Sequence, residues 1–251
     1  CRCLVGSEMC IRDRFIAIGC IAACSFAPAF ADDHGAESMG NGAFTTLFVS
    51  AADVDGYIDS VKSSTALFEA IGSDAAGYCE TISGRDEVGQ LMIWNAFGSV
   101  TDALVGGSKY DASKAAPDMA SQREFKYTAT WSPLKPFPRL DPGYERAMRI
   151  KLKPENLPAF IAAITKMEGE IIAAGHETFM NGLFVAMGGG TTEAGTYYLK
   201  SITSSVETHG AVIDDYFAGA SWGATYNEAS AMIDEVVNDQ FEVCEQFYTA
   251  N

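Results

Sequence analysis

NAFGSV at residues 95–100 and SITSSV at residues 201–206 align without gaps, and this match decides how we interpret the chain. In each stretch an apolar strand pattern ends just before a helical pattern begins. Ser99 and Ser205 stand at the junction, where a serine hydroxyl can accept a hydrogen bond from the first turn of a helix. We therefore expect the chain to contain an internal repeat.

The segments that precede these stretches also correspond. FTTLFVSA (44–51) and ERAMRIKLK (145–153) have strand patterns, and apolar residues near helical spacing follow in DVDGYIDSVKSSTALFEAIG (53–72) and PENLPAFIAAITKMEGEIIAAGH (154–176). Gly72 and Gly175 stand where a left-handed cap residue would end each helix. Each half therefore begins with a strand and a helix.

A hairpin and a second helix complete each half. AAGYCETIS (75–83) and QLMIWNAF (90–97) flank one loop, and FMNGLFVAM (179–187) and TYYLKSIT (196–203) flank the loop GGGTTEAG (188–195). EASAMIDEVV (228–237) is expected to extend the last helical region. REFKYTATW (123–131) and FEVCEQFY (241–248) supply the closing strands.

The resulting order, strand-helix-strand-strand-helix-strand, occurs twice and matches the ferredoxin-like split motif. Two tandem copies resemble the dimeric α+β barrel superfamily, which includes antibiotic-biosynthesis monooxygenase-like, chlorite-dismutase-like and stress-response barrel proteins. The resemblance implies an α+β fold in which two ferredoxin-like (βαββαβ) repeats, residues 43–132 and 144–251, form a pseudo-dimeric barrel within one monomeric chain. A linker at 133–143 holds all four prolines of WSPLKPFPRLDPGY (131–144).

The first 42 residues are expected to lie outside this fold. Residues 3–14 resemble a translated sequencing adapter, so residues 1–14 are excluded as an artefact. Residues 15–31 have the apolar run and small-residue cleavage site of a secretory signal peptide, although Cys24 ends an alternative lipoprotein motif. Residues 32–42 form a Gly-rich leader that we expect to be disordered. This organisation predicts a periplasmic or secreted protein, attached to a membrane only if Cys24 is lipidated.

The charge argues against two classes of partner. The chain has 17 Lys+Arg and 33 Asp+Glu, and removing the three basic and two acidic residues of positions 1–31 leaves 14 and 31, a net charge of −17. Nucleic acids and anionic membranes both require a basic surface. Neither is an expected partner.

No motif in the sequence identifies a catalytic residue, a metal site or a cofactor. His34 lies in the leader, whereas His176 and His209 are interpreted as solvated helix residues and form no recognisable zinc spacing. The run Gly188-Gly189-Gly190 lies between strands and lacks the Lys-Ser/Thr of a phosphate loop.

Strand alternation suggests a ligand pocket between the repeats. Met92 and Trp94 share a face that corresponds to Tyr198 and Lys200, and this face would line the inter-repeat cavity. The candidate pocket residues are Met92, Trp94, Trp131, Tyr198, His209 and Trp222. Ordinary core packing is the alternative, because aromatic residues and methionine fill protein cores routinely.

The barrel resemblance also suggests a disulfide between Cys79 and Cys244. It places their strands at the two edges that meet at one seam between the repeats, and exported proteins keep disulfides. Two buried free thiols are the alternative.

Three functions remain open at this point. The first is an exported protein that binds a small apolar ligand in the inter-repeat cavity. The second is a cofactor-independent monooxygenase-like or haem-barrel enzyme, which would need polar groups such as Asn95, His209 or Tyr198 to converge inside the cavity. The third is a packed interaction module.

Overall fold

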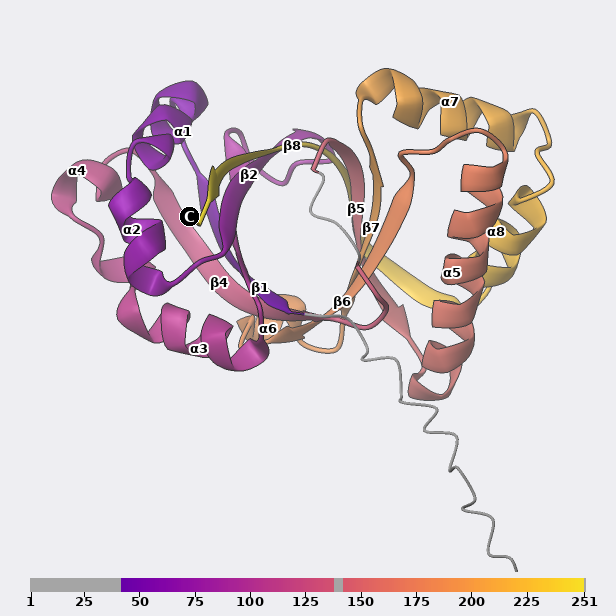
Figure 1. Ribbon diagram of the computed structural model, residues 1–251, viewed down its shortest axis with the longest axis horizontal. Helices are drawn as coiled ribbons and strands as arrows, with labels where there is room; N and C mark the ends of the chain where they lie inside the picture. The colour runs from indigo at the N-terminus through magenta and orange to yellow at the C-terminus, as the bar shows by residue number, and fades with distance from the viewer. Residues whose placement is uncertain (1–41, 138–141, 251) are drawn as a thin grey trace, which may run out of the picture. The chain divides into compact units, whose positions relative to one another are not determined.

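A computed structural model describes residues 42–137 and 142–250, and the adapter-like, signal and leader segments at 1–41 lie outside the described residues. Eight strands form a closed antiparallel barrel with helices on its outside (Figure 1). The strands are β1 (Ala43–Ser50), β2 (Ala75–Ser83), β3 (Gln90–Phe97), β4 (Glu124–Pro133), β5 (Tyr144–Leu152), β6 (Met180–Met187), β7 (Tyr197–Thr203) and β8 (Ile233–Thr249).

The helices fall into two groups, one for each half of the described chain (Figure 1). The first half has α1 (Val54–Lys62), α2 (Thr65–Ile71), α3 (Val100–Lys109), the 3₁₀ turn η1 (Ala112–Lys114) and α4 (Pro117–Ala120). The second half has η2 (Pro154–Asn156), α5 (Leu157–Ala173), α6 (Gly190–Glu193), α7 (Val206–Phe217) and α8 (Gly223–Ser230). None of these helices is long and apolar enough to cross a membrane.

The strand order explains how the barrel closes. The strands follow one another as β4-β1-β3-β2 in the first half and β8-β5-β7-β6 in the second. β2 pairs with β8, and β4 pairs with β6. Because each half contributes its two edge strands to these seams, none of the strands β1–β8 that the structure describes has an unpaired edge, and the exposed backbone groups that make edge strands prone to aggregation are removed.

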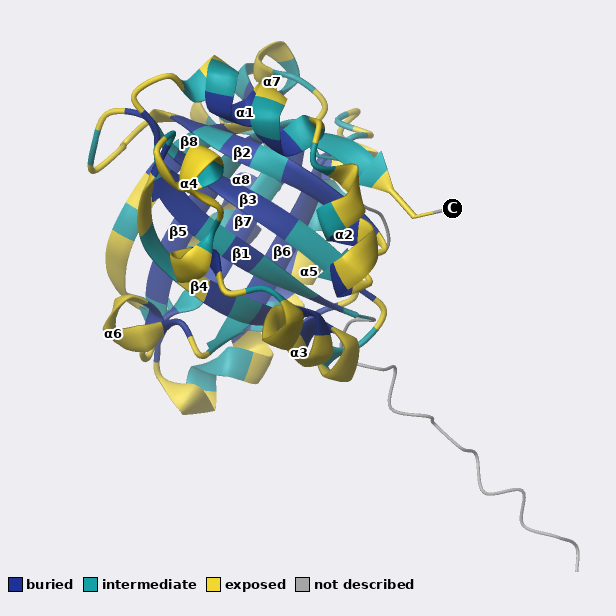
Figure 2. Cartoon of the chain, turned by 90° about the vertical axis from the view of Figure 1, so that its left-hand side faces the viewer, coloured by how far each residue is buried: buried dark blue, intermediate teal, exposed yellow. Residues whose placement is uncertain are grey.

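Side chains alternate between the two faces of each strand, so the barrel has one core inside it and others between the sheet and the helices. Side chains of one face point into the barrel and form a single cluster from both halves, which includes Met92, Trp94, Trp131 and Tyr198. Side chains of the other face pack under the helices in separate clusters for the first and second halves. Figure 2 shows the first half, with buried strand segments beneath α2, α3 and α4.

Both serine caps have the expected geometry. Ser99 accepts a hydrogen bond from the backbone N–H of Asp102, and Ser205 accepts one from Thr208. Gly72 ends α2 with φ of 75°, a left-handed conformation that favours glycine.

Three segments differ from the sequence predictions. The helix expected over 53–72 is broken into α1 and α2, because the hydroxyls of Ser63 and Ser64 bond to the carbonyl of Ser60 in place of continuing the helix. Residues 233–237, expected to be helical, begin β8, whose β-branched residues pair with β5. The loop at 188–195 contains the short helix α6.

Candidate functional site

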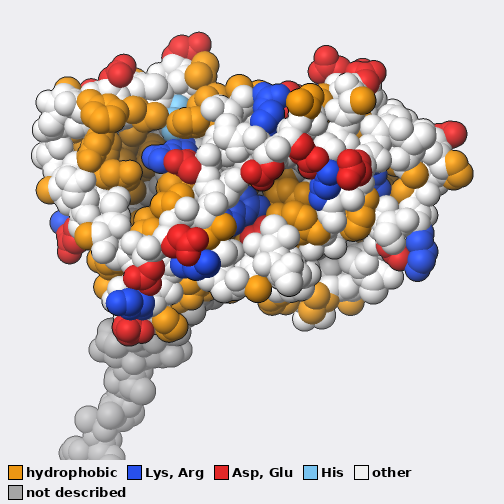
Figure 3. Space-filling model, turned by 180° about the vertical axis from the view of Figure 1, so that it is seen from behind, with side chains coloured by type: hydrophobic (Ala, Val, Ile, Leu, Met, Phe, Trp, Pro, Cys, Tyr) orange, Lys and Arg blue, Asp and Glu red, His pale blue; other side chains and the backbone are white. Residues whose placement is uncertain are grey.

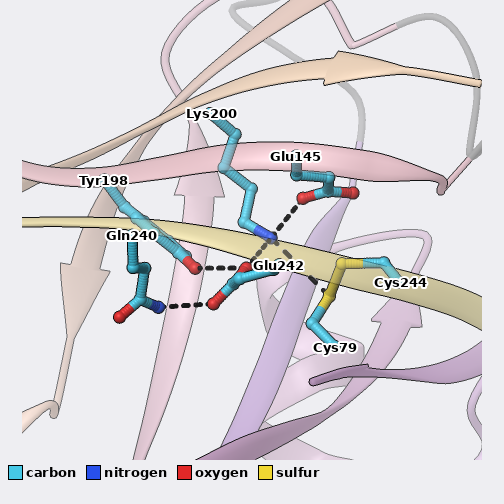
Figure 4. Close-up of a disulfide and its surroundings, with 7 residues drawn as sticks. All are labelled: Cys79, Glu145, Tyr198, Lys200, Gln240, Glu242 and Cys244. Atoms are coloured by element: carbon cyan, nitrogen blue, oxygen red, sulfur yellow. Dashed lines mark hydrogen bonds and ion pairs between the residues drawn. A yellow bond between two sulfur atoms is a disulfide. The ribbon is translucent and has the colours of Figure 1, made fainter. Parts of the chain in front are cut away.

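Inside the barrel, a buried cation lies between two buried carboxylates. The Lys200 ammonium is 2.5 Å from Glu145 Oε2 and 3.2 Å from Glu242 Oε2, and Figure 4 shows this contact. Burial lowers the pKa of Lys200, but the negative charges of Glu145 and Glu242 and the nearby Tyr198 outweigh burial, so the pKa is raised overall and Lys200 stays charged. Burial also raises the pKa of Glu145. This cluster is fully enclosed.

A disulfide lies beside that cluster. Cys79 on β2 and Cys244 on β8 are register partners, their Cα atoms are 4.0 Å apart, and the two sulfurs are bonded (Figure 4). Lys200 Nζ is 3.8 Å from Cys79 Sγ. Cys79, Glu145, Glu242 and Cys244 are close enough to hold a metal ion. Since both sulfurs are bonded to each other and Lys200 forms ion pairs with both carboxylates, we interpret the group as a structural element.

A second ion pair lies inside the same barrel. Arg149 Nη2 is 3.1 Å from Glu193 Oε1, and the guanidinium lies over the Tyr198 ring at 3.7 Å. Glu193 belongs to α6, so the loop between β6 and β7 folds back and supplies a buried counter-ion. Burial raises the pKa of Tyr198 to about 12, which keeps its hydroxyl protonated.

Four of the six predicted pocket residues lie in the barrel. Met92, Trp94, Trp131 and Tyr198 are each at most 6% exposed, and the rings of Trp131 and Tyr198 are 5.0 Å apart. Gly77 lies opposite Trp94, whose ring occupies the space that a Cβ at residue 77 would need. These large side chains pack against one another in the barrel core.

The other two predicted pocket residues lie elsewhere. Trp222 packs beneath α7 and α8 in a cluster outside the barrel, so its place in the pocket was predicted wrongly. His209 also lies outside the barrel. The prediction that it is solvated is wrong, because it is only 4% exposed and its ring packs against Tyr144 and Phe241. Asn95, His209 and Tyr198 therefore do not converge on one cavity.

A cavity of about 440 Å³ lies between the first-half helices and the outer face of β1, β3 and β4. Figure 2 looks onto this side of the molecule, where strand segments of intermediate burial lie between the helices. Its lining is mostly apolar and includes Leu47, Val61, Leu67, Phe68, Ile71, Ile93, Leu104 and Met119. A volume of a few hundred Å³ suits a small organic ligand. The cavity thus lies outside the barrel, on the face opposite to the expected one.

Arg123 is the charged residue that lines this cavity. It is 9% exposed and donates hydrogen bonds to the hydroxyls of Tyr57, at 3.0 Å, and Tyr110, at 3.3 Å, and to the carbonyl of Ala112, at 3.1 Å. Among the residues that the structure describes, no carboxylate forms an ion pair with it. Burial raises the pKa of Tyr57, although the Arg123 charge partly opposes this, so the Tyr57 hydroxyl stays protonated while its oxygen accepts the hydrogen bond from Arg123.

Neutral polar groups occupy the opposite end of the cavity floor. Asn95 on β3 is the register partner of Thr45 on β1, and Thr45 is the partner of Thr130 on β4. The Asn95 Oδ1 atom is buried and has no hydrogen-bond partner in the described part of the chain. A buried unpaired oxygen costs free energy, which a ligand that donates a hydrogen bond would recover.

The second half has a related cavity of about 370 Å³ between α5, α8 and the outer face of β5 and β7. Figure 3 shows a hollow with hydrophobic side chains on the side of the molecule that carries α5, α7 and α8. Its polar lining differs, because Arg146 is paired with Asp239 at 2.6 Å, and Asp234 and Glu235 lie at the cavity. The two cavities therefore differ in charge.

Comparisons with known proteins identify the fold. No protein-family model matches the sequence, and no curated protein does. A crystal structure of a protein described as a candidate monooxygenase from Lactobacillus acidophilus NCFM is similar over 84% of this chain and 96% of that chain, with 11% identity and a TM-score of 0.54. An anthrone oxidase-like protein is similar over 84% of this chain and 97% of that chain, with 10% identity and a TM-score of 0.55. A candidate chlorite dismutase is similar over 82% of this chain and 96% of that chain, with 11% identity and a TM-score of 0.50. The chain therefore has a fold of the dimeric α+β barrel type.

The residues of the two cavities do not fit a haem. Neither lining includes a histidine of the described part of the chain, in which His209 contacts Thr203 and His176 contacts Asp215.

Sequence reasoning missed Arg123 and Tyr57. Both lie in segments correctly placed as a strand start and a helix, but the hydrophobic pattern says nothing about which charge is buried. The sequence offered no signal for either residue, because an arginine at the start of an expected closing strand does not indicate which groups it contacts in the fold.

Proposed function

We propose that this protein is a monooxygenase-like enzyme that oxidises a small, largely apolar ring compound in the first-half cavity without a metal or an organic cofactor. The observation that carries the proposal is the buried Oδ1 of Asn95, which has no hydrogen-bond partner among the described residues and belongs to a residue that lines the mostly apolar cavity of about 440 Å³. The names of two structural neighbours, a candidate monooxygenase and an anthrone oxidase-like protein, support this class of reaction.

The lining limits which substrates can react. It contains no Asp, Glu, His or Lys among the residues described, so it supplies no strong base. The substrate must therefore be acidic itself, as an enolisable ketone or a phenol is. Asn95 Oδ1 would accept a hydrogen bond from the enol or phenol, and the Thr45 and Thr130 hydroxyls would stabilise the oxyanion that forms.

The reaction balances without a further reductant. An activated ring CH₂ loses a proton to water at the cavity opening, and the resulting enolate transfers electrons to O₂. One oxygen atom remains on the ring as a carbonyl, and the other leaves as water. The apolar lining favours this step because it holds the ring and dissolves O₂ while excluding most water.

An oxygen electrode tests the proposal, with anthrone as the probe. We expect protein-dependent O₂ uptake of one O₂ per anthrone, a rate at least tenfold lower in Asn95→Ala, and no change in the control Asn227→Ala, whose residue contacts Tyr216 on the helical surface. If O₂ uptake with the protein is no faster than without it, for anthrone and for simple naphthols alike, the proposed oxidation is contradicted.

Binding without turnover is the second candidate function, and the absence of a base from the described lining favours it. Saturable binding of anthrone with no O₂ uptake would assign this role.

We also propose that the two halves are ferredoxin-like repeats, with the expected bounds of 43–132 and 144–251, and that one chain is a functional monomer. The equivalent strand orders of the halves support this proposal. Sedimentation equilibrium tests it, since a stable dimer would contradict the monomer.

A further proposal is that the chain acts in the periplasm or outside the cell. The signal-like residues 15–31 and the disulfide support it, because disulfides persist in oxidising compartments. Fractionation of the native host tests it, and recovery of the protein in the cytosol with free thiols would contradict it.

A further inference from the structure

Arg123 is an unusual component of an apolar cavity. A guanidinium that is 9% exposed has lost most of its water, and desolvating a charge costs several kcal/mol unless a partner compensates. Its described partners, two tyrosine hydroxyls and a backbone carbonyl, are all neutral. Within the described ranges, 42–137 and 142–250, the buried positive charge therefore has no counter-ion.

The hydrogen bonds of Arg123 leave room for another acceptor. A guanidinium has five N–H groups, and the described bonds use one on Nη1 and two on Nη2. Nε and the second Nη1 hydrogen have no described acceptor. The cavity that Arg123 lines contains no acidic side chain among the described residues.

The position of Arg123 separates it from the proposed reaction site. Asn95 and Thr130 are both register partners of Thr45 on β1. Arg123 directly precedes Glu124, the first residue of β4, and Glu124 pairs with Ser50, five residues further along β1 than Thr45. Five residues of strand span roughly 17 Å. The cavity therefore has neutral acceptors and donors near one end, a cation near the other and an apolar wall between them.

From this arrangement, we propose that the ligand of the first-half cavity is an organic anion with an apolar ring body, and that Arg123 binds its carboxylate. The inference rests on the proposed function, because it assigns a substrate class to the same cavity. Tyr57 and Tyr110 orient the guanidinium, because their hydroxyl oxygens accept its hydrogen bonds. Arg123 is a specificity residue in this scheme, since it selects the anion and does not contact the reacting carbon.

The net negative charge of the chain does not prevent anion binding. Most of the acidic side chains lie at the surface, where salt screens them over about 10 Å at 0.1 M ionic strength. Arg123 itself is only 9% exposed, and at such a mostly buried position screening is weaker and a charge-assisted hydrogen bond is stronger.

Two aromatic probes of one size test the inference. 2-Naphthoate and 2-naphthylmethanol differ in charge but share a ring system, and calorimetric titration at pH 7 gives their dissociation constants. We expect the wild-type chain to bind naphthoate at least tenfold more tightly than naphthylmethanol. Arg123→Met should remove this preference, Arg123→Lys should keep part of it, and Arg85→Met should leave it unchanged, because Arg85 is an exposed cation outside the cavity.

Equal affinity of the wild-type chain for the two probes would overturn the inference and leave the proposed cavity function standing. A preference for naphthoate that survives in a folded Arg123→Met variant would also overturn it. If that variant does not fold, the wild-type comparison and Arg123→Lys still decide the question. Failure of both probes to bind would contradict the proposed function together with the inference.

Discussion

Cys79 on β2 and Cys244 on β8 lie directly opposite each other across the seam that joins the two halves, and a disulfide links them. The bond spans 165 residues of sequence, so it restricts the unfolded chain strongly. In the chain-entropy treatment, a loop of this length corresponds to a stabilisation of about 5 kcal/mol.

We therefore expect the double variant Cys79→Ala/Cys244→Ala to lose a few kcal/mol of unfolding free energy, measured by denaturant titration. The variant should retain the barrel, because the β2–β8 hydrogen bonds do not depend on sulfur. Unchanged stability, or two alkylatable thiols in the unfolded but unreduced protein, would contradict a structural disulfide.

Removal of the Lys200 charge should be costly. Lys200→Met leaves Glu145 and Glu242 buried beside each other without a cation, and breaking a buried ion pair in this way typically costs 3–5 kcal/mol. Adding Glu145→Gln and Glu242→Gln should restore most of the loss, because the uncompensated charges are then gone. As a surface control, Lys151→Met breaks an exposed pair with Glu235 and should cost less than about 1 kcal/mol. Equal losses for the two lysines would refute this account.

Two adjacent glycines of α3 should respond oppositely to alanine. A Cβ at Gly107 meets nothing within 4 Å, so Gly107→Ala should stabilise the helix by about 0.5–1 kcal/mol. A Cβ at Gly106 would lie 2.7 Å from the carbonyl oxygen of Ile71 and from the Phe97 ring, so Gly106→Ala should destabilise by about 1–3 kcal/mol. Thermal unfolding measures both, and a shift of the same sign in both variants would contradict the close approach of α3 to the sheet.

His209 should make the protein sensitive to acid. Burial, with a smaller effect of Arg146, lowers the pKa of His209 to about 4 from its ordinary 6.5. Between these values the unfolded chain binds a proton that the folded chain does not, so stability is complete above pH 6.5 and falls as the pH drops towards 4, by about 3 kcal/mol. His209→Gln should reduce the slope of unfolding free energy against pH in this window. Identical slopes for the variant and the wild type would show that His209 is not buried in its neutral form.

The order of strands and helices along the chain could be predicted because the hydrophobic alternation is strong and the two halves support each other, whereas the strands that meet at the seams were expected only from the resemblance to the barrel superfamily. The periodicity of Met92 and Trp94 correctly placed their side chains on the barrel side of the sheet. The break between α1 and α2 could not be read from periodicity, because it depends on two serine side chains that compete with the helix for backbone hydrogen bonds.

The candidate site was less predictable than the fold. The inward face carried the most conspicuous aromatic residues, and we expected a pocket there, but large rings such as Trp131 and Tyr198 pack against each other. The cavity instead lies beneath the helices, where its volume depends on how far α1–α4 stand from the sheet. Side-chain periodicity contains no information about that distance. His209 was misjudged for a similar reason, since its burial comes from Tyr144 and Phe241 in distant segments.

The most direct test of the central claim is a crystal structure of the full chain with 2-naphthoate bound. The account predicts the ring between the first-half helices and the outer face of β1, β3 and β4, with the carboxylate within hydrogen-bond distance of Arg123. A naphthoate bound inside the barrel, in the second-half cavity or only on the surface would contradict it.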